Sequence, residues 1–200
     1  MNPLFNYTLK LADDTLIFGQ RLGELCGQGP YLEEDIALTN IALDYLGQSN
    51  NFYKYAAQIQ DLGKTEDDLA FLRLEKEYLN CQLSELPNGD YANTILKVYF
   101  FSVYQKNLYT ELTKSSDVQL SGIAEKSLKE VKYHYTHTST WLKMFAGGTE
   151  ESKTRVKNAV ENLWEYTGGM FTETSGEEDL AKLEILPNGK EIQELWTKTV

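Results

Sequence analysis

KEVKYHYTH, residues 129–137, holds both histidines of the chain and lies inside one long predicted helix, from about residue 118 to residue 145. Apolar side chains recur along this segment at helical spacing. Its expected inward set is Leu120, Ile123, Ser127, Val131, His134, Thr138, Trp141 and Phe145. His134 belongs to this set and Glu130 borders it. A single histidine on an apolar face is more often a hydrogen-bonded core residue than a metal ligand, and both interpretations stay open here.

Long helices that carry Glu and His on their inward faces form the bundle of ferritin-like di-iron proteins. Such a centre takes one Glu from each of two helices and a Glu-x-x-His pair from each of the other two, since residues three apart face the same way. Here Val131 stands three residues before His134, and Glu130 stands four before it. No Glu-x-x-His pair occurs anywhere in the chain. The sequence therefore predicts the bundle without the di-iron centre.

Length and hydrophobic periodicity predict a single all-α domain over residues 1–200. A hydrophobic content of 42% suffices for one core, and four prolines with long periodic runs favour helices over a sandwich. The fold class expected is a ferritin-like helical bundle of about six long helices plus a short C-terminal helix. The expected helices are residues 3–26, 32–61, 66–86, 91–113, 118–145 and 149–171, with the short one around Trp196.

The charge of the chain excludes several classes of partner. A formal net charge of −11 argues against a nucleic-acid or anionic-membrane surface, which needs clustered Lys and Arg. No apolar run approaches the ~20 residues of a membrane-spanning helix, and no basic leader precedes an apolar segment. Cys26 and Cys81 lack metal-site spacing and are expected to be reduced thiols. We expect a cytoplasmic protein.

The segment 32–61 is apolar on nearly every face and is therefore expected at the centre of the bundle. Within it, Asn40, Asp44, Gln48 and Asn51 form a polar line at helical spacing. Buried polar groups need hydrogen-bond partners, so the line faces either a polar interior or another protein. Asp44 is interpreted as the remnant of a metal ligand, and the three amides as part of a partner interface.

The segment 66–86 carries a regular leucine seam at spacings of three and four residues, formed by Leu69, Leu72, Leu79, Leu83 and Leu86. Lys76 occupies one place in this seam and would need a carboxylate partner if it were buried. We hypothesise a metal-free interior network of Asp44, Glu75, Lys76, Glu130 and His134. The alternative is that the Lys76 head reaches solvent.

The segment 91–113 is crowded with aromatic residues on all sides, among them Tyr99, Phe100 and Tyr104. Aromatic residues are enriched both in protein interfaces and in bulky cores. We interpret these three residues as part of a partner interface and keep the core interpretation open.

Four blocks of the sequence carry a resemblance to a known family. They are LKLADDTLIFGQRLGELCGQGPYLEEDIALTNIALDYLGQSNNFYKYAA, LPNGDYANTILKVYFFSVYQ, KEVKYHYTHTSTWLKMFAGGTEES and VKNAVENLWEYTGGMF. They closely resemble the C subunits of bacterial phenylacetyl-CoA epoxidase, also called ring-1,2-epoxidase or phenylacetate-CoA oxygenase. The resemblance covers essentially the whole chain, and it also implies a further tail beyond the equivalent of Trp196.

The resemblance implies a non-catalytic, structural subunit that pairs with a homologous catalytic subunit. That partner would hold the di-iron centre and insert one oxygen atom of O2 into the ring of phenylacetyl-CoA, with electrons from NADPH supplied by a reductase. Further small subunits would complete the complex. No catalytic residue, metal or cofactor is expected in this chain, and a homodimer of the isolated chain stays an open alternative.

Two rival functions remain at this point. One is a metal-binding ferritin-like oxidoreductase with unusual ligands, drawn from Glu75, Glu130, His134 and His137, since histidine pairs bind zinc or iron. Its weakness is the shortage of ligands. The other is an unrelated helical interaction module, which the length of the matched blocks disfavours.

Overall fold

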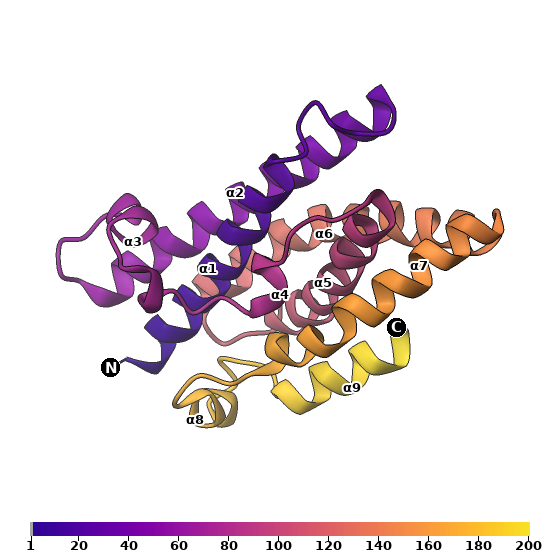
Figure 1. Ribbon diagram of the computed structural model, residues 1–200. Helices are drawn as coiled ribbons and strands as arrows, with labels where there is room; N and C mark the ends of the chain where they lie inside the picture. The colour runs from indigo at the N-terminus through magenta and orange to yellow at the C-terminus, as the bar shows by residue number, and fades with distance from the viewer. Residues whose placement is uncertain (1) are drawn as a thin grey trace.

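The computed structural model describes residues 2–200, and these residues form helices and loops without any strand (Figure 1). They are 77% helical, which confirms the predicted all-α, ferritin-like bundle. The elements are α1 Pro3–Gly23, α2 Leu32–Gln60, α3 Glu66–Phe71, η1 Glu75–Glu77, α4 Gln82–Glu85, α5 Tyr91–Leu112, α6 Val118–Ala146, α7 Glu150–Leu163, η2 Trp164–Phe171, α8 Glu177–Lys182 and α9 Gly189–Thr199.

The four long helices form two pairs, α1 along α2 and α5 along α6 (Figure 1). Helices α7 and α9 pack on α5, and η2 lies among α4, α7 and α9. Buried apolar residues form one cluster that extends from Phe5 in α1 to Trp196 in α9. The C-terminal third of the chain therefore completes the core.

Capping side chains mark the starts of α5 and α6. Asp90 accepts a hydrogen bond from the N–H of Asn93 at the start of α5, and Asp117 accepts one from the N–H of Leu120 at the start of α6. Such side chains satisfy N–H groups that have no partner within the helix. All four long helices begin where the sequence predicts them, and they end within three residues of the predicted positions.

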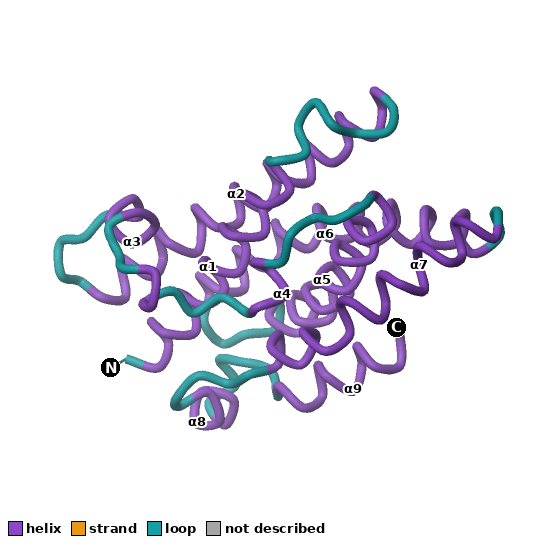
Figure 2. The backbone as a smooth tube through the Cα atoms, viewed as in Figure 1, coloured by secondary structure: helices purple, strands orange, loops and turns teal. Residues whose placement is uncertain are grey.

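The predicted third long helix is wrong. The segment 66–86 folds as three short pieces, α3, η1 and α4, joined by loops (Figure 2). Leu72 is 77% exposed, whereas Leu69 and Leu83 are buried, so the leucine seam does not exist. Carboxylates on α1 accept hydrogen bonds from the backbone of this segment, and these bonds compete with a helical ladder.

The expected burial of α2 on all sides is wrong for its N-terminal half. Leu32, Ile36 and Leu43 are exposed, because the α1–α2 hairpin extends beyond the α5–α6 pair (Figure 1). The predicted sixth helix is also divided, since α7 ends at Leu163 and the chain continues as the tighter helix η2.

Gly19 in α1 marks a close approach of two helices. A Cβ atom placed there would lie 3.1 Å from the carbonyl oxygen of Ala42 and 3.2 Å from Cγ of Leu46 in α2. Gly122 in α6 provides the matched comparison, because a Cβ there meets nothing within 4 Å.

We predict opposite effects for alanine at these two helical glycines. Gly19→Ala should lower the free energy of unfolding by roughly 1–3 kcal/mol, because α1 and α2 must separate. Gly122→Ala should raise it by about 0.5–1 kcal/mol, because alanine loses less backbone entropy. Urea unfolding of both variants measures this, and stabilisation by Gly19→Ala would contradict the close packing.

Candidate functional site

The buried histidine of α6 is bonded to the carboxylate of α2. His134 is 0% exposed, and its Nε2 lies 2.9 Å from Oδ2 of Asp44. An ionised carboxylate only accepts hydrogen bonds, so Nε2 carries the proton. The His134 ring also packs against the buried Tyr45, with 4.9 Å between the ring centroids. The imidazole is therefore held by α2 through both a hydrogen bond and a ring contact.

Glu130, one turn earlier on α6, belongs to a separate chain of hydrogen bonds. The side-chain amide of Gln48 donates to Glu130 over 2.9 Å, the Tyr109 hydroxyl donates to Gln48 over 3.4 Å, and the Gln105 amide donates to Tyr109 over 3.0 Å. Burial raises the pKa of Glu130, and the bond from Gln48 opposes this shift. These four side chains connect α2, α5 and α6.

Glu34 gathers three polar side chains near the start of α2. Its Oε2 accepts hydrogen bonds from the Tyr91 hydroxyl at 2.5 Å and the Trp141 indole at 2.8 Å, and it lies 3.1 Å from Nε2 of His137. Burial lowers the pKa of His137, and the nearby Glu34 opposes this shift. Sequence analysis missed this role of Glu34, for which the only signal is an acidic residue in a first helical turn.

The centre of the four-helix bundle beside His134 is filled by aromatic rings. Phe18 and Phe101 stack with 4.5 Å between centroids, and Tyr45 lies 5.1 Å from Phe18 and 5.7 Å from Phe101. A ferritin-like di-iron centre instead needs inward carboxylates and histidines from all four helices. Within residues 2–200, no three His, Cys, Asp or Glu residues are grouped to hold a metal ion. The donor set of this bundle does not fit a di-iron centre.

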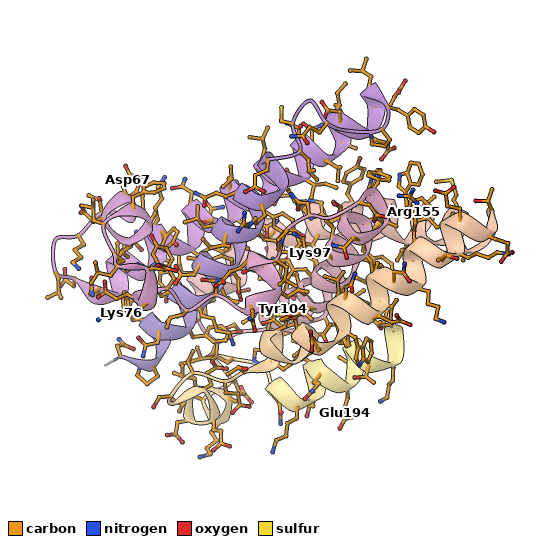
Figure 3. The ribbon with its side chains drawn as sticks, in the orientation of Figure 1. Asp67, Lys76, Lys97, Tyr104, Arg155 and Glu194 are labelled. Carbon is orange, nitrogen blue, oxygen red and sulfur yellow. The ribbon has the colours of Figure 1, made fainter. Side chains whose placement is uncertain are left out.

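The structure brings together part of the predicted interior network. His134 is bonded to Asp44, and Glu130 lies one turn before His134 on α6. Glu75 and Lys76 are exposed on η1, and Figure 3 shows Lys76 at one end of the molecule, so their predicted place in the interior is wrong. The reason is that their segment is not the helix that the leucine spacing indicated. For the same reason Glu75 does not join Glu130, His134 and His137, so the alternative metal-ligand set is not assembled.

Half of the predicted partner interface is interior. Phe100 and Tyr104 are 2% and 5% exposed, and Figure 3 shows Tyr104 in the middle of the molecule. Trp196 donates a hydrogen bond to the Phe100 carbonyl, and Phe171 packs edge-on against Tyr104. Gln48 is buried as well. These three assignments to an interface are wrong, and the aromatic excess of α5 is a core covered by η2 and α9. The remaining predicted interface residues have exposed surface and are Asn40, Asn51 and Tyr99.

A second buried polar cluster joins α1 to the segment that precedes α4. Asp13 is 0% exposed and accepts hydrogen bonds from Tyr53, from both terminal nitrogens of Arg73 and from the N–H of Leu79. The neighbouring Asp14 accepts one from the N–H of Cys81 over 2.6 Å. Sequence analysis missed both carboxylates, although two adjacent Asp residues in an apolar helix were the available signal.

Comparison with known proteins assigns this bundle to a family. The family model described as "Phenylacetic acid catabolic protein" matches residues 1–200. The chain belongs to this family. It is 40% identical, over 200 residues, to the C subunit of 1,2-phenylacetyl-CoA epoxidase of Escherichia coli (strain K12), a match that covers all of this chain and 80% of that protein. The resemblance stated from the sequence blocks is thereby confirmed.

Across residues 2–200, every helix is too short or too polar to cross a lipid bilayer.

In this member of the family, Arg73→Met should be strongly destabilising. The substitution leaves the Asp13 carboxylate buried without its cation, which typically costs 3–5 kcal/mol in the free energy of unfolding. Arg155 is the matched control, since its pairs with Glu151 and Asp90 are exposed and Arg155→Met should hardly move the unfolding midpoint. Equal effects of the two substitutions in urea unfolding would refute the role assigned to Asp13–Arg73.

Asp14 should make stability depend on pH. Burial raises the pKa of Asp14 to about 6, and Lys10 and the Cys81 N–H oppose this shift. The unfolded value is about 3.9, so the stabilising contribution of the protonated form is complete below about pH 4 and is lost as pH rises through about 6. The free energy of unfolding should therefore fall by roughly 3 kcal/mol over this pH range.

This contribution is measured as the difference between two titrations. Between about pH 4 and pH 7, the free energy of unfolding measured in urea should fall less for Asp14→Asn than for the native chain. The exposed control, Asp67→Asn, should follow the native chain. Parallel curves for Asp14→Asn and the native chain would show that Asp14 titrates normally.

Proposed function

We propose that this chain is the structural subunit of a phenylacetyl-CoA epoxidase and that it pairs with a homologous, di-iron catalytic subunit. The family and the 40% identical relative support the assignment to this enzyme complex. The proposed role is non-catalytic, and no metal or cofactor is proposed in this chain. One observation carries this part of the proposal, namely that aromatic rings fill the centre where a ferritin-like protein holds its metal ions.

The side chains near that centre support the same role. His134 and Glu130 are each engaged by a residue of α2, and both bonds cross between helices. These bonds hold both side chains against α2, and no third carboxylate, histidine or cysteine within residues 2–200 is grouped with them to hold a metal ion. These bonds restrain α6 against α2, and we infer that the bundle is rigid.

Rigidity is what a catalytic di-iron subunit would gain from its partner. A metal centre is productive only when its ligands are held within a fraction of an ångström, and the surrounding protein must supply that support. A homologous bundle packed along the catalytic one would restrain its helices without taking part in the chemistry. Interfaces of this permanent kind typically bury ~2,000 Å² or more and have an apolar centre.

The exposed face of α2 is the proposed contact with the catalytic subunit. It presents Ile36 and Leu43, which are 50% and 59% exposed, with the exposed amide of Asn40 between them. These positions follow one stripe of the helix at spacings of four and three residues. Tyr133 on α6 is also 50% exposed and directly precedes His134, which is bonded to Asp44 of α2.

Co-expression with the catalytic subunit tests the proposed function. Iron should be present in the purified complex and absent from this chain purified alone, since the donors for the centre are expected in the partner. Stoichiometric iron in the isolated chain would overturn the structural role. Failure of the two chains to co-purify would overturn the pairing.

Substitutions test the proposed face. Ile36→Glu with Leu43→Glu should reduce recovery of the complex at least tenfold, because two charges would be buried in an apolar contact. The control is Leu183→Glu, which introduces a charge at a residue that is 64% exposed beside α8. Equal recovery of both variants would place the interface elsewhere.

A further inference from the structure

Exposed apolar side chains gather at a second place, in the segment that replaces the predicted third helix. We call residues 61–79 the α3 end, which projects at one end of the molecule (Figure 1). Single exposed apolar residues are normal on a protein surface, but several together mark an interaction site. The most exposed large apolar side chains of the α3 end are Leu62 at 71%, Phe71 at 62%, Leu72 at 77% and Leu74 at 63%.

The exposed leucines flank an anchored residue. Arg73 lies between Leu72 and Leu74, and its guanidinium is buried against Asp13 and lies 4.2 Å from the Tyr78 ring centroid. It also donates to the carbonyl of Glu77 over 2.9 Å.

Further bonds fix the backbone on the C-terminal side of the anchor. The N–H of Leu74 donates to the Glu77 carboxylate over 2.6 Å, and the N–H of Leu79 donates to Asp13 over 2.8 Å. These bonds fix the backbone of residues 73–79, while the apolar side chains of Leu72 and Leu74 face solvent. Such preorganisation lowers the entropic cost of binding a partner.

Charge decides which kind of partner fits. The α3 end carries six carboxylates, at Asp61, Glu66, Asp67, Asp68, Glu75 and Glu77. Against them stand Lys64 and Lys76 of the same segment and Lys54 of α2, which lies 3.7 Å from Glu66, whereas Arg73 is neutralised by Asp13. Figure 3 shows Asp67 and Lys76 at this same end of the molecule. An apolar surface with an acidic rim is complementary to an apolar surface with a basic rim.

The same charge disfavours two other occupants. A symmetric contact between two copies of this chain would bring both acidic rims together, and like charges across an interface cost several kcal/mol. A bilayer with anionic lipids repels an acidic rim for the same reason.

We propose that the α3 end is a docking surface for a second protein, separate from the α2 face, whose contact surface is apolar at its centre and rimmed by Lys and Arg. The exposed side chains of Phe71, Leu72 and Leu74 insert into that surface, and the surrounding carboxylates pair with its basic residues. The proposal relies on the proposed function only for the choice of proteins in its test.

Site-specific photocrosslinking in the assembled complex tests the proposal. The full chain carries benzoylphenylalanine in place of Leu72 and is co-expressed with the other subunits of the epoxidase. The expected product is a crosslink to a peptide of another protein with a net positive charge, and its yield should fall as salt rises. In a separate experiment, benzoylphenylalanine in place of Ile36 should crosslink to the catalytic subunit. That crosslink tests the proposed function independently of the Leu72 crosslink.

Two sets of variants provide the controls. Leu72→Ser with Leu74→Ser should reduce binding of the crosslinked protein at least tenfold, and so should Asp67→Lys with Glu75→Lys. Leu183→Ser with Leu195→Ser removes two other exposed leucines and should have no effect. All altered side chains are exposed, so unchanged thermal unfolding midpoints should show that each variant is folded.

Three outcomes would overturn the proposal. The first is a Leu72 crosslink to a second copy of this chain, the second is the absence of any crosslink in the intact complex, and the third is a crosslink that charge reversal leaves unchanged.

Discussion

The ion pair between Asp13 and Arg73 is the interaction on which the arrangement of the chain most depends. Both side chains are almost fully buried, at 0% and 8% exposed. Removing two charges from water is costly, and such a pair adds little net stability, but separating its members is strongly unfavourable. Tyr53 and the N–H of Leu79 also bond to Asp13. The pair therefore fixes where the segment after α2 must lie against α1.

That constraint explains why a good helical pattern does not become a helix. The leucine spacing of residues 66–86 predicts one amphipathic helix, yet the N–H groups of Leu79 and Cys81 bond to the carboxylates of Asp13 and Asp14. A backbone N–H that bonds to a side chain is lost to the helical ladder. The core that such a helix would have closed is completed by η2 and α9, which cover the aromatic residues of α5.

The requirement that buried polar groups be satisfied also shapes the interior of the bundle. His134 and Glu130 each reach across to α2, and Lys97 on α5, with its pKa lowered by burial to about 8, donates to the Leu86 carbonyl and to Asn88. The stacked rings of Phe18 and Phe101 occupy the remaining centre. Polar side chains thus connect the elements of the bundle to one another, whereas the exposed apolar side chains of α2 and the α3 end face solvent.

The sequence by itself determined the all-α class, the extents of α1, α2, α5 and α6, the lack of any Glu-x-x-His pair and the family resemblance. These features depend on residue identity and on spacing within one segment, which are local properties. Only the tertiary structure decided that Phe100 and Tyr104 are core, that Lys76 is exposed, and that Asp13 pairs with Arg73, sixty residues away. A periodic pattern shows which side chains share a face, but the covering of that face depends on contacts between distant segments.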